Sequence, residues 1–132
     1  MKNLKKISII IAAFAIITAQ QSFAASSILG TTGTSPYQIV IDTAGNIYTS
    51  NSDSDNVSKI TPAGVSSILG TTGDNPIGIT IDADGNIYTA NLDSNNVTKI
   101  TPAGVSSILG TTGDNPFGIV VDTVGNLSLI HI

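Results

Sequence analysis

Residues 66–105 read SSILGTTGDNPIGITIDADGNIYTANLDSNNVTKITPAGV, and residues 26–65 before them agree with this stretch at 29 of 40 positions. A third copy begins at Ser106 and matches the second at 16 of 21 positions through Asn126, where the agreement stops. A repeat of this length indicates a solenoid, a propeller or an array of small units. The content of one unit therefore decides the fold.

Each unit alternates short apolar runs with turn signals. In the second copy the runs are residues 77–81, 87–91, 97–101 and 105–109. Their period-two alternation predicts strands, and nothing after residue 25 has the pattern of an amphipathic helix. The sequences DADGN (82–86) and TPAG (101–104) predict tight turns, because aspartate caps turn amides and glycine accepts a positive φ.

Four short antiparallel strands in every 40 residues predict an all-β fold, a β-propeller built from four-stranded blades. In the second strand, Tyr88 and Ala90 lie on one face of the sheet, and Ile87 and Thr89 lie on the other. Both faces must therefore pack against neighbouring sheets, as in stacked blades. A parallel β-helix is the main alternative, but its coils are usually shorter and need no paired tight turns. We therefore expect about two and a half blades, in residues 26–65, 66–105 and 106–126.

The stretch NPIGITIDADGNIYTANLDSNNVTKITPAG (75–104) resembles the NHL repeat. In that repeat Pro, Gly-Ile, Asp, Gly-Asn and a Tyr or Val strand are followed by Val-x-Lys-Ile-x-Pro-x-Gly. The resemblance covers residues 26–126 and implies a six-bladed propeller. Such repeats occur in secreted bacterial proteins, in eukaryotic binding scaffolds and in relatives of streptogramin lyase and the gluconolactonases, so the resemblance is specific for fold and not for function.

The N-terminus has the parts of a bacterial export signal. Three lysines within the first six residues precede an uncharged, mostly apolar run over residues 7–19. Ser22 and Ala24 supply the small residues that signal peptidase requires. We predict a signal peptide over residues 1–24, cleavage between Ala24 and Ala25, and a secreted or periplasmic protein with no stable membrane anchor. An uncleaved anchor is the alternative, which the shortness of the apolar run disfavours.

The sequence after this site is acidic and has no cysteine. It holds two lysines, Lys59 and Lys99, against nine aspartates, which gives a formal charge of −7. Such a charge disfavours nucleic acid and anionic membranes as partners. Without disulfides, the fold must be held by packing and backbone pairing.

Residues 25–126 contain no His, Cys, Glu, Arg or Trp, and His131 lies in the tail. No Ser-His, Cys-His or glutamate-based catalytic group can be built from them. The resemblance implies an axial histidine for lyase-like catalysis and a glutamate, an asparagine and an aspartate around a divalent metal for lactonase-like catalysis. The histidine and the glutamate have no counterpart here. We expect a binding or structural scaffold for an unknown protein or carbohydrate ligand, the alternative being an enzyme whose catalytic residues lie in further blades.

Acidic loops raise the question of a bound cation. The sequence NSDSDN (51–56) places Asn51, Asp53 and Asp55 at alternate positions, as the opening of a calcium loop does. No glycine follows at the sixth position, no glutamate closes the loop, and the next copy has Leu92 and Asn95 in place of Ser52 and Asp55. We therefore predict a solvated loop and no cofactor, with calcium unsupported.

Propeller topology places the loop after each second strand and the crossing between blades on one face. Residues 51–56 and 91–96 form the loops, and residues 70–76 and 110–116 form the crossings. We expect any ligand on this face. The candidate ligand-binding residues are Asn51, Asp53, Asp55, Asp74, Asn91, Asp93 and Asp114.

We interpret two further recurring patterns as structural. Asp42, Asp82 and Asp122 precede each Gly-Asn turn, and we interpret them as turn caps, with a ring of metal-binding carboxylates as the alternative. Asn56 and Asn96 open the glycosylation patterns Asn-Val-Ser and Asn-Val-Thr. These patterns recur because the repeat does, so we give them little weight.

The tail, LSLIHI (127–132), breaks the repeat. It matches the translation of CTG TCT CTT ATA CAC ATC, the adapter end of a transposase-based sequencing library, so we expect it to be adapter-derived and non-native. A short native strand is the alternative. Closed propellers use about four to eight blades, or roughly 160 to 320 residues at this repeat length. We therefore expect the gene to continue, the alternative being a ring formed by self-association.

Overall fold

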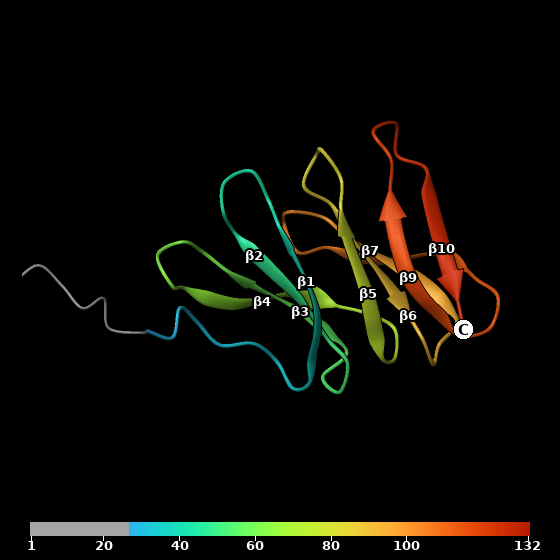
Figure 1. Cartoon of the computed structure of the whole chain (residues 1–132), viewed down its shortest axis with the longest axis horizontal. Helices are drawn as coiled ribbons and strands as arrows, with labels where there is room; N and C mark the ends of the chain where they lie inside the picture. The colour runs from blue at the N-terminus through green and yellow to red at the C-terminus, as the bar shows by residue number, and fades with distance from the viewer. Residues whose placement is uncertain (1–26) are drawn as a thin grey trace, which may run out of the picture.

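The computed structural model describes residues 27–132, so the predicted signal peptide and its cleavage between Ala24 and Ala25 lie outside the described residues. Over that range the chain forms ten strands and no helix (Figure 1). Accordingly, residues 27–132 contain no helix that is long and apolar enough to cross a membrane.

The strands form two four-stranded antiparallel sheets and a two-stranded third sheet (Figure 1). The first sheet is β1 (Pro36–Ile41), β2 (Ile47–Asn51), β3 (Asn56–Ile60) and β4 (Ser66–Thr71), in that order. The second sheet is β5 (Pro76–Ile81), β6 (Ile87–Asn91), β7 (Asn96–Ile100) and β8 (Ser106–Thr111), and the third is β9 (Pro116–Val121) with β10 (Leu127–His131). The predicted four-stranded blades are confirmed, with strand bounds in the second copy shifted by at most two residues.

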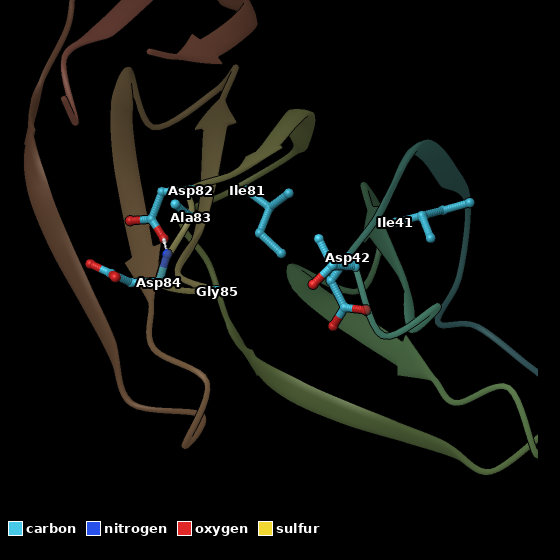
Figure 2. A pocket seen from close by; sticks show the side chains of 8 residues that line it. Ile41, Asp42, Ile81, Asp82, Ala83, Asp84 and Gly85 are labelled. Atoms are coloured by element: carbon cyan, nitrogen blue, oxygen red, sulfur yellow. Dashed lines mark hydrogen bonds between the residues drawn. The ribbon is translucent and has the colours of Figure 1, made fainter. Parts of the chain in front are cut away.

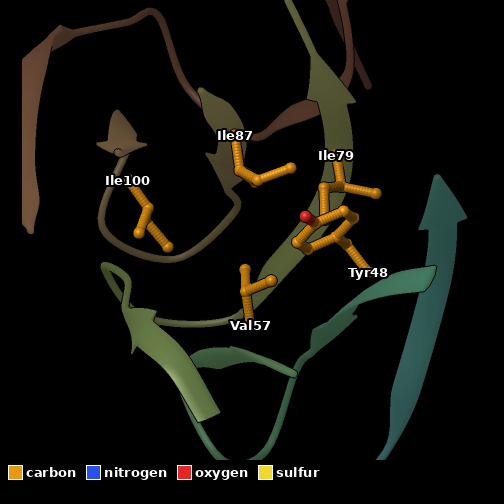
Figure 3. Close-up of a cluster of buried hydrophobic side chains, with 5 residues drawn as sticks. All are labelled: Tyr48, Val57, Ile79, Ile87 and Ile100. Carbon is orange, nitrogen blue, oxygen red and sulfur yellow. The ribbon is translucent and has the colours of Figure 1, made fainter. Parts of the chain in front are cut away.

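The sheets stack through both of their faces, as the two-sided apolar pattern predicts. Tyr48 and Val57 of the first sheet point toward Ile79, Ile87 and Ile100 of the second, and these five side chains form one buried cluster (Figure 3). Burying apolar side chains of this size contributes about 1.5–3 kcal/mol each, so the sheets depend on one another for stability.

The other face of the second sheet packs on the third sheet. Tyr88, Ala90 and Val97 form a second buried cluster with Ile119 of β9. Two leucines of β10 pack against that cluster. The first strands of the three sheets, β1, β5 and β9, contact one another in turn. They therefore lie along one edge of the stacked sheets, as Figure 1 also shows, and we call them the inner strands.

Equivalent residues in successive repeats meet different surroundings. Leu69 of β4 packs against the first buried cluster, whereas the equivalent Leu109 of β8 is 53% exposed. The difference arises because β4 lies over β7, while the third sheet has only β9 and β10 in the described residues.

Gly70 and Gly110 form a matched pair for testing this packing. A Cβ atom on Gly70 would lie 2.6 Å from Ser106 Oγ and 2.8 Å from Ile100 Cγ2, whereas a Cβ atom on Gly110 would meet nothing within 4 Å. We expect Gly70→Ala to lower the free energy of unfolding by about 1–3 kcal/mol, because it overpacks a filled interface. Gly110→Ala should change it by no more than about 0.5 kcal/mol. Urea denaturation of both variants measures the difference, and equal losses would contradict the packing of β4 on the second sheet.

Residues 127–131 of the tail form β10 and pair with β9, from Leu127 opposite Val121 to His131 opposite Pro116. Alternating apolar and polar residues favour a strand whatever their source. The adapter origin of residues 127–132 therefore stays a prediction.

Candidate functional site

The loops after the second strands and the crossings between blades lie together, as predicted. Ser52 N–H donates to Ser35 O over 2.9 Å, and Leu92 N–H donates to Asn75 O over the same distance. In the second copy Asp74 N–H also donates to Ser94 Oγ over 2.9 Å. Thr72 N–H donates to Asp55 O and Thr112 N–H donates to Asn95 O, each over 2.9 Å. Together these bonds join residues 51–56, 70–76, 91–96 and 110–116 into one surface, which we call the loop face.

Four predicted ligand-binding aspartates are exposed on the loop face: Asp53, Asp74, Asp93 and Asp114. Asp53 Oδ2 accepts a bond from Ser35 Oγ at 2.5 Å, and Asp93 Oδ2 accepts one from Asn75 Nδ2 at 3.3 Å. The other oxygen of each of these two carboxylates has no partner within the chain among the hydrogen bonds of the described residues. The loop face therefore presents negative charge to solvent.

Asp55 joins two blades. Its Oδ1 atom accepts a bond from the Asn75 backbone N–H at 2.9 Å, and its backbone has a φ of 50°. In the next repeat Asn95 Oδ1 accepts the equivalent bond from Asn115 N–H at 2.8 Å. Because an amide oxygen accepts this hydrogen bond as a carboxylate oxygen does, the charge of Asp55 is not required for the contact between the blades.

Asn51 and Asn91, which we predicted as ligand-binding residues, lie beneath the loop face and are fully buried. Asn91 Nδ2 donates to Asn96 Oδ1 over 2.6 Å and to Thr98 Oγ1 over 2.9 Å, and its Oδ1 accepts from Thr89 Oγ1 at 2.8 Å. Asn51 makes the equivalent three bonds. Their amides hold the second and third strands together below the loops, so the structure corrects their expected role.

The glycosylation pattern at Asn56 falls on an occupied amide. Asn56 Nδ2 donates to Ser54 O over 2.9 Å, and its Oδ1 accepts from Asn51 Nδ2 at 2.7 Å. A sugar on Nδ2 would replace one of the two hydrogens of a half-buried amide that already donates to Ser54 O, which agrees with the little weight we gave to this pattern.

The recurring aspartates before the Gly-Asn turns cap those turns at the opposite end of the blades. Asp82 Oδ1 accepts bonds from the backbone N–H groups of Asp84 and Asn86, at 3.0 and 2.8 Å. Asp82 Oδ2 accepts from Asn86 Nδ2 at 2.8 Å and from Tyr88 Oη at 2.9 Å. The glycine in each turn has a positive φ, which is +82° at Gly85.

A hollow of about 310 Å³ lies between the first two of these turns (Figure 2). It is lined by Ile41, Asp42, Thr43, Ile81, Asp82, Ala83, Asp84 and Gly85. The carboxylates of Asp42 and Asp82 are already used in capping, so we assign the hollow no ligand. Within residues 27–132, no group of three or more His, Cys, Asp or Glu side chains could hold a metal ion.

The capping bonds shift pKa values. The bond from Asn46 is the main cause that holds the pKa of Asp42 below its usual value, and burial opposes it. For Asp82, burial raises the pKa, but the bonds from Asn86 and Tyr88 outweigh burial, so the pKa is again lowered. Burial, aided by the bond to Asp42, raises the pKa of Tyr48 to about 12.

These pKa shifts predict how the free energy of unfolding depends on pH. A lowered carboxylate pKa stabilises the fold above about pH 4, and that contribution is lost as the pH falls through the folded-state pKa. The raised pKa of Tyr48 stabilises the fold below about pH 10, and this contribution is lost as the pH rises through about 12. Asp82→Asn should flatten the acid side of the unfolding profile, and Tyr48→Phe should flatten the alkaline side. Asp84→Asn, which removes an exposed carboxylate that makes no capping bond, is the control.

Two bulky residues of the inner strands were not predicted as site residues. Tyr37 of β1 and Phe117 of β9 contact each other through their rings, and both are exposed near the loop face. The sequence carried one signal for them, since this repeat position holds Tyr37, Ile77 and Phe117 among otherwise similar copies.

Known proteins resemble the chain in structure and not in sequence. No protein-family description matches it, and no curated protein matches it. A virginiamycin B lyase from Staphylococcus aureus matches with a TM-score of 0.64 at 20% identity, over 73% of this chain and 34% of that one. A streptogramin B lyase structure matches with a TM-score of 0.55 at 16% identity, over 71% and 39%. The chain has a β-propeller fold.

A propeller chain of a nidogen/laminin complex also matches, with a TM-score of 0.59 at 19% identity, over 77% of this chain and 38% of that one. The described β-propeller thus spans between 34% and 39% of the length of these three structures. At such identities the likeness establishes the fold alone, and the NHL resemblance stays a prediction.

Proposed function

We propose that this chain belongs to an exported β-propeller of NHL-repeat type, which serves as a scaffold that binds a protein or carbohydrate ligand at the loop face. The observation that carries the proposal is the set of exposed carboxylates there, in Asp53, Asp74, Asp93 and Asp114. Loops held by a rigid sheet scaffold are where binding residues concentrate. The charge of Asp55 is not needed for its bond to Asn75, because Asn95 makes the equivalent bond with a neutral amide, so this charge can also contribute to recognition.

Neutral variants of the loop face test this proposal. We expect Asp53→Asn with Asp93→Asn to weaken binding of the full chain to immobilised glycans or peptides at least tenfold. Asp84→Asn on the opposite face is the matched control and should bind as the unaltered protein does. If both variants bind alike, or if the unaltered chain binds no member of either array, the proposal is wrong.

Export has its own test. In a bacterial host the mature protein should begin at Ala25, because Ser22 and Ala24 form the signal-peptidase site. N-terminal sequencing of the protein recovered outside the cytoplasm measures this directly. An Ala24→Tyr variant should remain uncleaved, and an unprocessed native chain would contradict the prediction.

An enzyme is the second candidate function, and the likeness to virginiamycin B lyase favours it. One solved structure shows a catalytically inactive variant of that lyase with quinupristin. Residues 25–126 have no histidine or glutamate to act as acid or base, so we expect the chain to leave quinupristin intact. Consumption of quinupristin would favour the enzyme. Long-read sequencing across the codon of Asn126 is a second test. His, Glu or Arg on the axial face of further blades would also favour an enzyme.

A further inference from the structure

The inner strands share a distortion at their loop-face ends. The pairing register shifts between Pro36 and Gln38 of β1 and between Pro76 and Gly78 of β5. The register of β9 also shifts, between Pro116 and Gly118. Each shift leaves one bulged residue, which is Tyr37, Ile77 or Phe117. Bulges re-aim side chains and are over-represented beside functional sites.

Two of the bulged residues, Tyr37 of β1 and Phe117 of β9, form an aromatic pair. The rings of Tyr37 and Phe117 meet edge to face, with 6.1 Å between centroids and 89° between planes. Ile77 on β5 between them is buried, while Tyr37 is 59% and Phe117 is 36% exposed. We call this pair with Ile77 the axial platform. Aromatic side chains are enriched at the centres of protein interfaces.

Exposed aspartates of the loop face precede the platform residues in the chain or are bonded next to them. Asp114 lies three residues before Phe117, Asp74 lies three residues before Ile77, and Asp53 is bonded to Ser35, two residues ahead of Tyr37. The two lysines of the described residues, by contrast, lie over the rings of Tyr48 and Tyr88, each 5.6 Å from the centroid. Those tyrosines bond to the turn-capping aspartates at the far end of the blades.

Two independent features therefore favour the same ligand charge. The faces of aromatic rings carry negative potential and attract cations, with or without nearby carboxylates. Exposed aspartates without a compensating lysine attract cations over a longer range. An anion would be repelled by both, and an uncharged sugar would gain from neither charge.

We propose that the axial platform binds an organic cation that carries an apolar or aromatic group, with its ammonium on the Tyr37 ring and its apolar part on Phe117. A free amine and a basic side chain of a protein share this chemistry. The inference rests on the proposed binding role of the loop face and narrows its ligand to a cationic one.

Benzyltrimethylammonium is the probe, with benzyl alcohol and phenylacetate as its neutral and anionic counterparts. The full chain has three tyrosines and no tryptophan, and Tyr48 and Tyr88 are buried, so Tyr37 should report binding through its fluorescence. We expect saturable binding of the cation at least tenfold tighter than of either counterpart. A short peptide with adjacent Phe and Arg residues, compared with the free amine, distinguishes a protein source from a small molecule.

Variants distinguish binding at the axial platform from non-specific binding to the protein surface. Titration calorimetry is the readout here, because it does not depend on the tyrosine. Tyr37→Ala and Phe117→Ala should each weaken cation binding at least fivefold, whereas Tyr37→Phe should retain it because the ring face remains. Ile68→Ala removes an equally exposed side chain on β4, outside the platform, and should have no effect. Circular dichroism confirms that each variant is folded.

Absence of cation binding, equal binding of the three probes, or full binding by Tyr37→Ala would overturn the inference. Its failure is distinguishable from that of the proposed function. If the Asp53→Asn and Asp93→Asn variant loses array binding while the cation does not bind, only the axial platform is wrong. If the unaltered chain binds neither the arrays nor the cation, both proposals fail.

Discussion

Ile79→Ala is expected to lower the free energy of unfolding by about 2–5 kcal/mol, because it removes a buried side chain and leaves a cavity between two blades. Ile79 is 2% exposed and packs against Tyr48 and Val57 of the preceding sheet. Urea denaturation of the full chain, followed by far-ultraviolet circular dichroism, measures the loss.

Ile39 provides the matched control, since it holds the same position in the preceding repeat but is 55% exposed. Ile39→Ala removes the same atoms from the equivalent strand of the preceding blade and should cost less than about 1 kcal/mol. Similar losses for the two variants would show that the first two blades do not pack through Ile79 as described.

Asn91→Ala is expected to cost about 3 kcal/mol, because a buried polar group left without its partner costs roughly 1–3 kcal/mol. Removal of the amide leaves Asn96 Oδ1 without its donor and Thr89 Oγ1 without its acceptor beneath the loop face. The measurement is again equilibrium unfolding in urea.

Asn126→Ala is the control for Asn91→Ala. It also removes an amide that donates a hydrogen bond, to Asp122 Oδ2 over 2.8 Å, but at an exposed turn where water can replace the bond. We expect a loss of no more than about 1 kcal/mol. A larger loss at Asn126 than at Asn91 would contradict the structural role of the buried amide.

Local patterns sufficed to predict the blades. The alternation around Ile79 and the Asp-Gly-Asn signal at Asp82 depend on neighbouring residues only, and the structure confirms both the strand and the turn. The shared face of loops and crossings followed from the number of strands in each repeat.

The candidate site was harder to predict because burial depends on distant contacts. Asn91 and Asp93 look alike as polar residues of one loop, yet one is fully buried and the other exposed. Tyr37 alternates with its neighbours like any strand residue, and only the register shift turns it toward Phe117. A bulge is decided by pairing between strands, which single-residue preferences do not encode.

The contrast between Leu69 and Leu109 has a thermodynamic consequence. In stacked repeats, stability approximates a sum of intrinsic terms for each unit and coupling terms between neighbours, as in a one-dimensional Ising chain. The strands β4 and β8 have the same sequence but different neighbours, so the difference between equivalent variants at Leu69 and Leu109 isolates the coupling. Large coupling makes the described blades melt in a single transition. Weak coupling would give separate transitions that begin where Leu109 lies uncovered.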